Sequence, residues 1–128
     1  MAGFLDLIGK IMIEEIRFTA TEVNCYVEDD VTIIGIGDDV VSPDHFIILS
    51  RFDEEDIDNS IGLMTHLSDI EAINTLVKIT LDRKNITLTL KNNVVITIYL
   101  DIEDNHFIQL NDYLQQILQG SSIKLIEK

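Results

Sequence analysis

Residues 86–100 read ITLTLKNNVVITIYL, and this stretch determines the fold class that we expect. Apolar and polar side chains alternate on both sides of Asn92-Asn93, as in strands with one buried face. Asparagine tolerates the positive φ of a tight turn, so the two runs are predicted to form a β-hairpin. Residues 77–81 alternate in the same way and are followed by the polar Arg83-Lys84-Asn85. The three runs together predict an antiparallel meander.

Further strands are expected upstream of the meander. Residues 31–37 and 45–52 are rich in β-branched and aromatic side chains, and the turn-forming residues 38–44 separate them, so they are predicted to pair. The apolar residues within 16–27 stand at even positions up to residue 20 and at odd positions from residue 23. This change predicts a β-bulge near Thr21-Glu22. Residues 62–68 form a weaker candidate strand.

The apolar period becomes helical after Asp104. One stripe contains Phe107, Leu110, Leu114 and Ile117. Asp104 or Asn105 is expected to cap the start of the helix, and Gly120 is expected to end it. The predicted fold class is α+β: one mostly antiparallel β-sheet of about seven strands, with a C-terminal amphipathic helix packed on one face.

The composition predicts a single domain over residues 1–128. Apolar residues make up 46% of the chain, and no Pro/Gly/Ser-rich linker divides it. Residues 1–13 are expected to form an N-terminal extension, in which Phe4, Leu7, Ile8 and Ile11 suit a short amphipathic helix. With Cys25 as the only cysteine, no basic leader and no apolar run of about 18 residues, we expect a cytoplasmic protein.

The negative charge is concentrated in one part of the sequence. The net charge is −14; residues 1–71 hold 17 acidic and 3 basic side chains, whereas residues 72–128 hold 6 of each. Residues 28–58 contain 11 carboxylates and a single cation, Arg51. Such a concentration repels nucleic acid and attracts basic partners.

The histidines and the cysteine do not form a recognisable catalytic or metal motif. His45, His66 and His106 lack a spacing that would place two imidazoles on one metal ion. Cys25 alternates with the neighbouring valines, which predicts a core thiol rather than a nucleophile.

Two further motifs fail when they are tested position by position. Gly35-Ile36-Gly37 follows a strand, but Val40 stands where the dinucleotide fingerprint needs its third glycine. A calcium loop starting at Asp56 would have Ile61 in place of the required glycine. We therefore expect no catalytic residue, no metal and no cofactor.

The acidic string at residues 53–58 is the strongest candidate for a functional site. A solubilising turn would explain it equally well, but Glu28-Asp29-Asp30, Asp38-Asp39 and Asp44 also lie in predicted strand connections. If these loops converge on one edge of the sheet, they form a docking site for a basic protein. The predicted partner-binding residues are Asp38, Asp39, Asp53, Glu54, Glu55, Asp56 and Asp58.

Residues 16–118 resemble the bacterial polymorphic-toxin immunity proteins of immunity protein family ten. The clearest stretch is residues 45–52, similar to a family strand that ends in an apolar pair and Gln-Arg. Asp53-Glu54-Glu55-Asp56 and then Gly62 follow, similar to the family's D-E-Q-D segment and later glycine. The sequence departs from the family pattern at Ser50, where glutamine is expected, at Asp69, where glutamate is expected, and at residues 72–75, which lack a glycine pair.

The resemblance implies an immunity protein that binds and neutralises a toxin delivered by a neighbouring cell, as in contact-dependent growth inhibition. Many such toxins are nucleases or other basic enzymes, which agrees with the acidic charge. The expected partner is a cognate toxin protein and neither nucleic acid nor a membrane, with the oligomeric state left open. The alternatives are a structural or assembly subunit that pairs through a sheet edge and, third, an enzyme.

Overall fold

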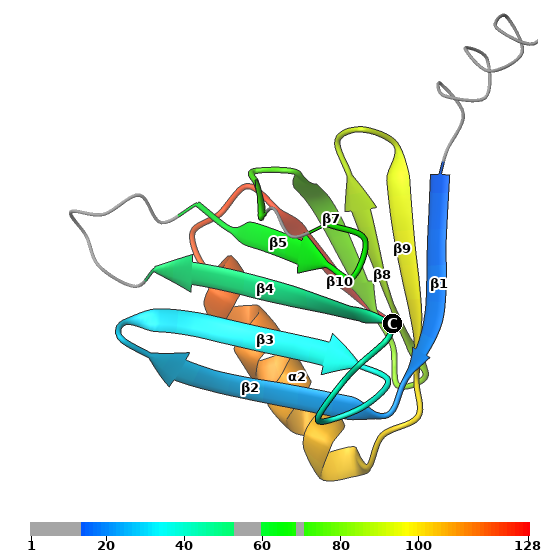
Figure 1. Ribbon diagram of the computed structural model, residues 1–128. Helices are drawn as coiled ribbons and strands as arrows, with labels where there is room; N and C mark the ends of the chain where they lie inside the picture. Colours follow the sequence, from blue (N-terminus) through cyan, green and yellow to red (C-terminus); the bar gives the residue numbers. More distant parts are fainter. Residues whose placement is uncertain (1–13, 53–59, 69–70) are drawn as a thin grey trace, which may run out of the picture.

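Two β-sheets and a helix make up the described part of the chain, residues 14–52, 60–68 and 71–128 of a computed structural model. Each sheet has five strands, and Figure 1 shows the sheets as two layers with the helix behind the front one. The predicted α+β class is confirmed. The expectation of one sheet with about seven strands is wrong.

Sheet A contains the predicted meander. Its strand order is β1-β9-β8-β7-β10, and the strands are β1 (Glu14–Ala20), β7 (Leu76–Leu81), β8 (Asn85–Leu90), β9 (Val94–Leu100) and β10 (Lys124–Glu127). The β8–β9 hairpin turns at Asn92-Asn93, where Asn93 has a φ of 67°, as predicted. β1 pairs in parallel with β9, and β10 pairs in parallel with β7. The sequence does not predict these parallel pairs, because strands distant in sequence leave no turn signal between them.

Sheet B is antiparallel throughout its described strands. Its order is β2-β3-β4-β5-β6, and the strands are β2 (Glu22–Glu28), β3 (Val31–Gly37), β4 (Phe46–Phe52), β5 (Gly62–Thr65) and β6 (Ala72–Ile73). β3 and β4 pair as predicted from residues 31–37 and 45–52, with Val31 opposite Phe52 and Gly37 opposite Phe46. The weaker candidate at residues 62–68 is a strand as far as Thr65.

The chain passes from sheet A to sheet B at Thr21, which corrects the predicted β-bulge. Ala20 is the last residue of β1 and Glu22 the first of β2, so the strands on either side of Thr21 belong to different sheets. Each sheet turns its own inner face toward the shared core. The buried residues are therefore even-numbered in β1, up to Ala20, and odd-numbered in β2, from Val23 on. The Thr21 backbone N–H donates to the Gly37 carbonyl at 3.0 Å, which fixes the crossing point to sheet B.

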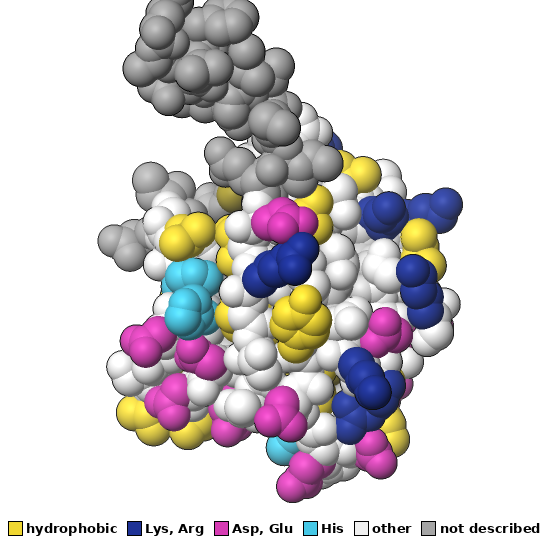
Figure 2. Space-filling view, turned by 90° about the vertical axis from the view of Figure 1, so that its right-hand side faces the viewer, with side chains coloured by type: hydrophobic (Ala, Val, Ile, Leu, Met, Phe, Trp, Pro, Cys, Tyr) yellow, Lys and Arg dark blue, Asp and Glu magenta, His cyan; other side chains and the backbone are white. Residues whose placement is uncertain are grey.

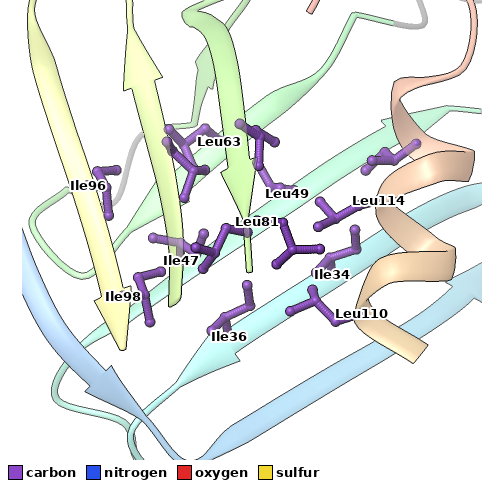
Figure 3. Packing of buried hydrophobic residues seen from close by; sticks show 14 of the residues in the cluster. Ile34, Ile36, Ile47, Leu49, Leu63, Leu81, Ile96, Ile98, Leu110 and Leu114 are labelled. Atoms are coloured by element: carbon purple, nitrogen blue, oxygen red, sulfur yellow. The ribbon is translucent and has the colours of Figure 1, made fainter. Parts of the chain in front are cut away.

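A single apolar core lies between the two sheets and the helix. Figure 3 shows Ile34, Ile36, Ile47 and Leu49 of sheet B pointing toward side chains of sheet A and of the helix. These residues are at most 1% exposed, and burying each such side chain contributes about 1.5–3 kcal/mol. This core therefore holds the two sheets and the helix together.

The helix α2 (Asp104–Leu118) packs against β2 and β3 with the predicted stripe, of which Leu110, Leu114 and Ile117 are buried. The N-cap is Glu103, whose side chain makes no capping bond, so the predicted caps Asp104 and Asn105 are wrong. Asp104 instead accepts a hydrogen bond of 2.9 Å from Arg83 Nε. Gly120 follows the helix with a φ of 73°, as expected for the residue that ends it.

Candidate protein-docking surface

The charge asymmetry of the sequence is an asymmetry between the two sheets. Residues 22–73, which supply β2 to β6, contain 14 acidic side chains and one basic side chain, and the rest of the chain contains 9 acidic and 8 basic side chains. Figure 2 shows histidine and acidic side chains together on one flank and most lysine and arginine side chains on the other. Eight of these 14 acidic side chains lie in the described residues, so sheet B with its described loops is the acidic layer. The strands and hairpin turns of sheet A, residues 14–20, 76–100 and 124–127, hold 4 acidic and 6 basic side chains.

The two described acidic loops lie at opposite ends of sheet B, which corrects the expectation that the acidic loops converge on one edge. β3 is antiparallel to both β2 and β4, so the turn at residues 28–30 lies at the Val31–Phe52 end of sheet B. Asp38, Asp39 and Asp44 lie at the opposite end, beside the Gly37–Phe46 pair. The predicted docking residues Asp53, Glu54, Glu55, Asp56 and Asp58 lie outside the described residues.

Asp29 and Asp30 form the turn between β2 and β3. Their φ angles are 52° and 63°, in the left-handed region that aspartate and asparagine tolerate better than most residues. Two successive positive φ values are characteristic of a type I′ hairpin turn. These two carboxylates therefore have a local role in the turn, besides adding charge to this end of sheet B.

Asp38 and Asp39, both predicted to bind a partner, hold the β3–β4 loop in shape. Asp38 Oδ1 accepts the backbone N–H groups of Asp44 and His45 at 3.0 and 3.2 Å, and Asp38 Oδ2 lies 2.8 Å from His45 Nδ1. Asp39 Oδ2 accepts the N–H groups of Ser42 and Val41 at 2.9 and 3.2 Å.

These hydrogen bonds also change the acidity of both carboxyl groups. The hydrogen bond with the His45 side chain is the main cause that lowers the pKa of Asp38. The N–H groups of Ser42 and then Val41 lower the pKa of Asp39. Both groups are therefore carboxylates at neutral pH, fixed in position by the loop.

His45 and His66 contact each other, although 20 residues separate them in the sequence. Their ring centroids are 4.9 Å apart, and Phe18 of β1 lies 5.8 Å from each ring. The backbone N–H of Phe46 donates to His66 Nδ1 at 3.1 Å. No sequence motif indicates this cluster, because the β4–β5 pairing is what brings the two histidines together.

The Asp38–His45 pair is the arrangement closest to acid–base chemistry in the described residues. An aspartate that orients an imidazole is half of a nucleophilic site. Cys25 cannot supply the nucleophile, because it is buried and burial raises the pKa of its thiol to about 12. The loop-closing bonds of Asp38 are sufficient to account for the pair.

The outer face of sheet B carries several large apolar side chains, and no sequence pattern indicates this face. The Glu71 carboxylate also lies on it, where Oε1 accepts a hydrogen bond of 2.6 Å from Ser50 Oγ. Its outward positions include Tyr26, Ile33, Ile48, Phe52, Met64 and Ile73. Tyr26 is 38% exposed, Phe52 41% and Ile73 55%. The outer face of sheet A carries mainly the threonines Thr80, Thr87, Thr89 and Thr97, with Tyr99 among them, 44% exposed. A sheet face with large exposed apolar side chains is characteristic of an interaction surface.

A hollow of about 530 Å³ lies on this outer face, where β2, β3 and β4 meet the β3–β4 loop. Gly35 lies between Asn24 and Ile48 in the register of the sheet and forms part of the lining. Val40 and Phe46 also line the hollow, which is mostly apolar. The carboxylate residues among its lining are Glu22 and Asp39.

Residues 14–52, 60–68 and 71–128 contain no group of three or more His, Cys, Asp or Glu side chains arranged to hold a metal ion. α2, the helix that the structure describes, is not long and apolar enough to cross a bilayer. Neither the protein-family models nor the curated proteins compared with this sequence match it. The resemblance to immunity proteins therefore stays a prediction.

Proposed function

We propose that this chain is a cytoplasmic immunity protein that binds a basic bacterial toxin domain through the outer face of sheet B. The observation that carries the proposal is the coincidence of two properties in one layer: sheet B has an apolar outer face and comes from the segment with 14 acidic residues and one basic residue. An apolar centre with a charged rim is the usual anatomy of a protein interface. The chain acts by binding rather than by catalysis.

The two acidic ends of sheet B take the place of the single acidic patch expected from the sequence. Glu28, Asp29 and Asp30 lie at one end, and Asp38, Asp39 and Asp44 lie at the other. A basic protein that approaches the apolar face is attracted from both sides, which raises the association rate and fixes the orientation of the complex. The same field opposes the approach of nucleic acid to the bound toxin.

The test uses the toxin domain encoded beside the gene for this chain. That domain is expressed in a bacterial host with and without the chain, and surviving colonies are counted. Ile33→Glu places a charge in the outer face of sheet B and is expected to abolish protection. The matched control, Thr87→Glu, places the same charge on the outer face of sheet A and is expected to protect fully.

Two results would contradict the proposal. One is a neighbouring gene that encodes no toxic domain. The other is full protection by Ile33→Glu when that variant is folded and purified to the same level as the wild type.

The second candidate function is a structural subunit that pairs through a sheet edge. The observation in its favour is that β2 is a terminal strand of seven residues, hydrogen-bonded to β3 alone among the described strands. An edge of this kind offers unpaired N–H and C=O groups to another chain. Sedimentation over a hundredfold range of concentration separates the two functions, because edge pairing predicts self-association and an inhibitor needs none.

A further inference from the structure

Glycine at position 35 keeps the hollow on sheet B open. Gly35 lies in the middle of β3 with its missing side chain directed to the outer face, between Asn24 and Ile48. A Cβ atom at this position would meet the Asn24 carbonyl oxygen at 3.6 Å, an ordinary contact. Glycine in a strand interior weakens the strand, and it often marks a place where another molecule approaches the backbone closely. Packing does not require glycine here, whereas an open hollow does.

The wall of the hollow is preorganised. The β3–β4 loop that supplies Val40 and Pro43 is closed by the Asp38 N–H, which donates to the His45 carbonyl at 3.1 Å. Thr21 Oγ1 donates to the Asp38 carbonyl at 3.1 Å and ties the loop to the crossing between the sheets. A wall that is ordered before binding reduces the entropy lost when a ligand enters.

The size and charge of the hollow define its occupant. A volume of about 530 Å³ lies within the range of ligand pockets, and it accommodates an aromatic side chain together with the stem of a neighbouring long side chain. Its apolar surface suits the ring. Glu22 and Asp39 favour a cationic neighbour and disfavour an anionic one. Arginine and lysine combine an apolar stem with a cationic end, which matches both properties.

We propose that this hollow is the anchor pocket of the docking surface, and that it receives an aromatic or large aliphatic side chain flanked by Lys or Arg on the partner protein. The inference rests on the proposed function, since it takes the partner to be a basic protein. It adds a defined point of attachment to the outer face of sheet B. Buried anchors of this kind supply a large share of the binding energy in protein interfaces.

The test uses short peptides, so it does not depend on the identity of the toxin. Acetyl-Arg-Phe-Arg-amide is titrated into the ¹⁵N-labelled full chain, and the amide signals of Gly35, Gly37 and Ile48 are followed. Saturable shifts of these signals are expected. Acetyl-Glu-Phe-Glu-amide and acetyl-Arg-Gly-Arg-amide are expected to cause no saturable shift, because the first carries the wrong charge and the second lacks the ring.

Gly35→Val fills the hollow and is expected to abolish the peptide shifts while the chain stays folded, because valine suits a strand and the added Cβ makes an ordinary contact of 3.6 Å with the Asn24 carbonyl oxygen. Glu22→Gln removes one of the two carboxylates without altering the loop that Asp39 holds, and it is expected to weaken peptide binding several-fold. Glu28→Gln, at the other end of β2, is the matched control and is expected to bind as the wild type does.

Four outcomes would overturn the anchor pocket. The first is equal binding of the Arg-Phe-Arg and Glu-Phe-Glu peptides, and the second is unchanged binding by a folded Gly35→Val variant. The third is a change of oligomeric state in Gly35→Val, which would assign the hollow to a second copy of this chain. The fourth is peptide binding that appears only when residues 1–13 are removed, which would assign the hollow to the chain's own N-terminal segment.

Failure of the pocket and failure of the proposed function give different results. If Gly35→Val still protects cells from the toxin and Ile33→Glu does not, the docking face stands and the pocket is wrong. If the wild type does not protect cells but the peptide shifts depend on Gly35 and on Glu22, the pocket binds basic aromatic segments and the toxin assignment is wrong.

Discussion

The guanidinium group of Arg51 donates a hydrogen bond of 2.7 Å to the carbonyl oxygen of Ile117, in the last turn of α2. The same Nη1 atom donates to the Gln119 carbonyl, also at 2.7 Å. These carbonyl groups carry the partial negative charge of a helix C-terminus, and a cation stabilises them. The one basic residue of the acidic segment 22–73 thus serves to bind α2 to sheet B.

Arg51→Met is expected to lower the free energy of unfolding by about 1–3 kcal/mol, because it removes hydrogen bonds from a charged donor and leaves the helix end uncompensated. Urea denaturation followed by circular dichroism measures the change. Arg51→Lys keeps the charge and is expected to recover part of the loss. If Arg51→Met unfolds at the same urea concentration as the wild type, water hydrogen-bonds these carbonyl groups as well as Arg51 does, and this explanation is wrong.

The strands of this fold are visible in the sequence, and their distribution between two sheets is not. The β8–β9 hairpin is predictable because alternation and turn residues are local properties. The parity change around Thr21 is also visible, but a bulge within one strand and a passage between two sheets produce the same pattern. Only the pairing of β1 with β9, about 80 residues further along the chain, distinguishes them.

The acidic composition of the candidate site is predictable, whereas its geometry is not. The sequence shows which loops are acidic, but the antiparallel order of β2, β3 and β4 separates them to two ends. The apolar outer face is hidden for a different reason. β3 and β4 carry apolar residues at both odd and even positions, a pattern typical of strands that are buried on both faces. In the structure, the apolar core packs on the inner face of these strands.

Cys25 is expected to resist alkylation in the folded protein. Burial raises the pKa of its thiol to about 12, so at pH 8 the thiolate is roughly a thousandfold scarcer than in a free cysteine. Mass spectrometry after brief iodoacetamide treatment should show almost no modification in buffer and complete modification in 8 M urea. Rapid labelling of the native protein would mean that β2 opens readily.

Asp38→Asn is expected to lower the melting temperature at neutral pH and to have little effect in acid. The pKa of Asp38 is lower in the folded chain than in the unfolded chain, because His45 and two backbone N–H groups bind the carboxylate. A carboxyl group of this kind stabilises the fold above its unfolded pKa, near 4, and the contribution disappears as the pH falls through the folded pKa.

Melting curves between pH 7 and pH 3 compare this variant with Asp112→Asn, which alters an exposed carboxylate on α2. The difference between wild type and Asp38→Asn should shrink below about pH 4, and Asp112→Asn should follow the wild type throughout. A difference that grows in acid would have the wrong sign for this explanation.

Asp29→Asn combined with Asp30→Asn is expected to slow association with the toxin domain without loss of stability. Asparagine accepts the positive φ of both turn positions, so the β2–β3 hairpin is retained while two charges leave one end of sheet B. Steering by exposed charges is screened by salt. Stopped-flow association rates should therefore fall several-fold at about 20 mM NaCl and approach the wild-type rate at about 500 mM.

Asp101→Asn with Asp112→Asn removes two carboxylates from outside sheet B, and this control should leave the rate almost unchanged. Equal slowing by both pairs would mean that total charge, rather than its concentration on sheet B, determines how fast the partner is captured.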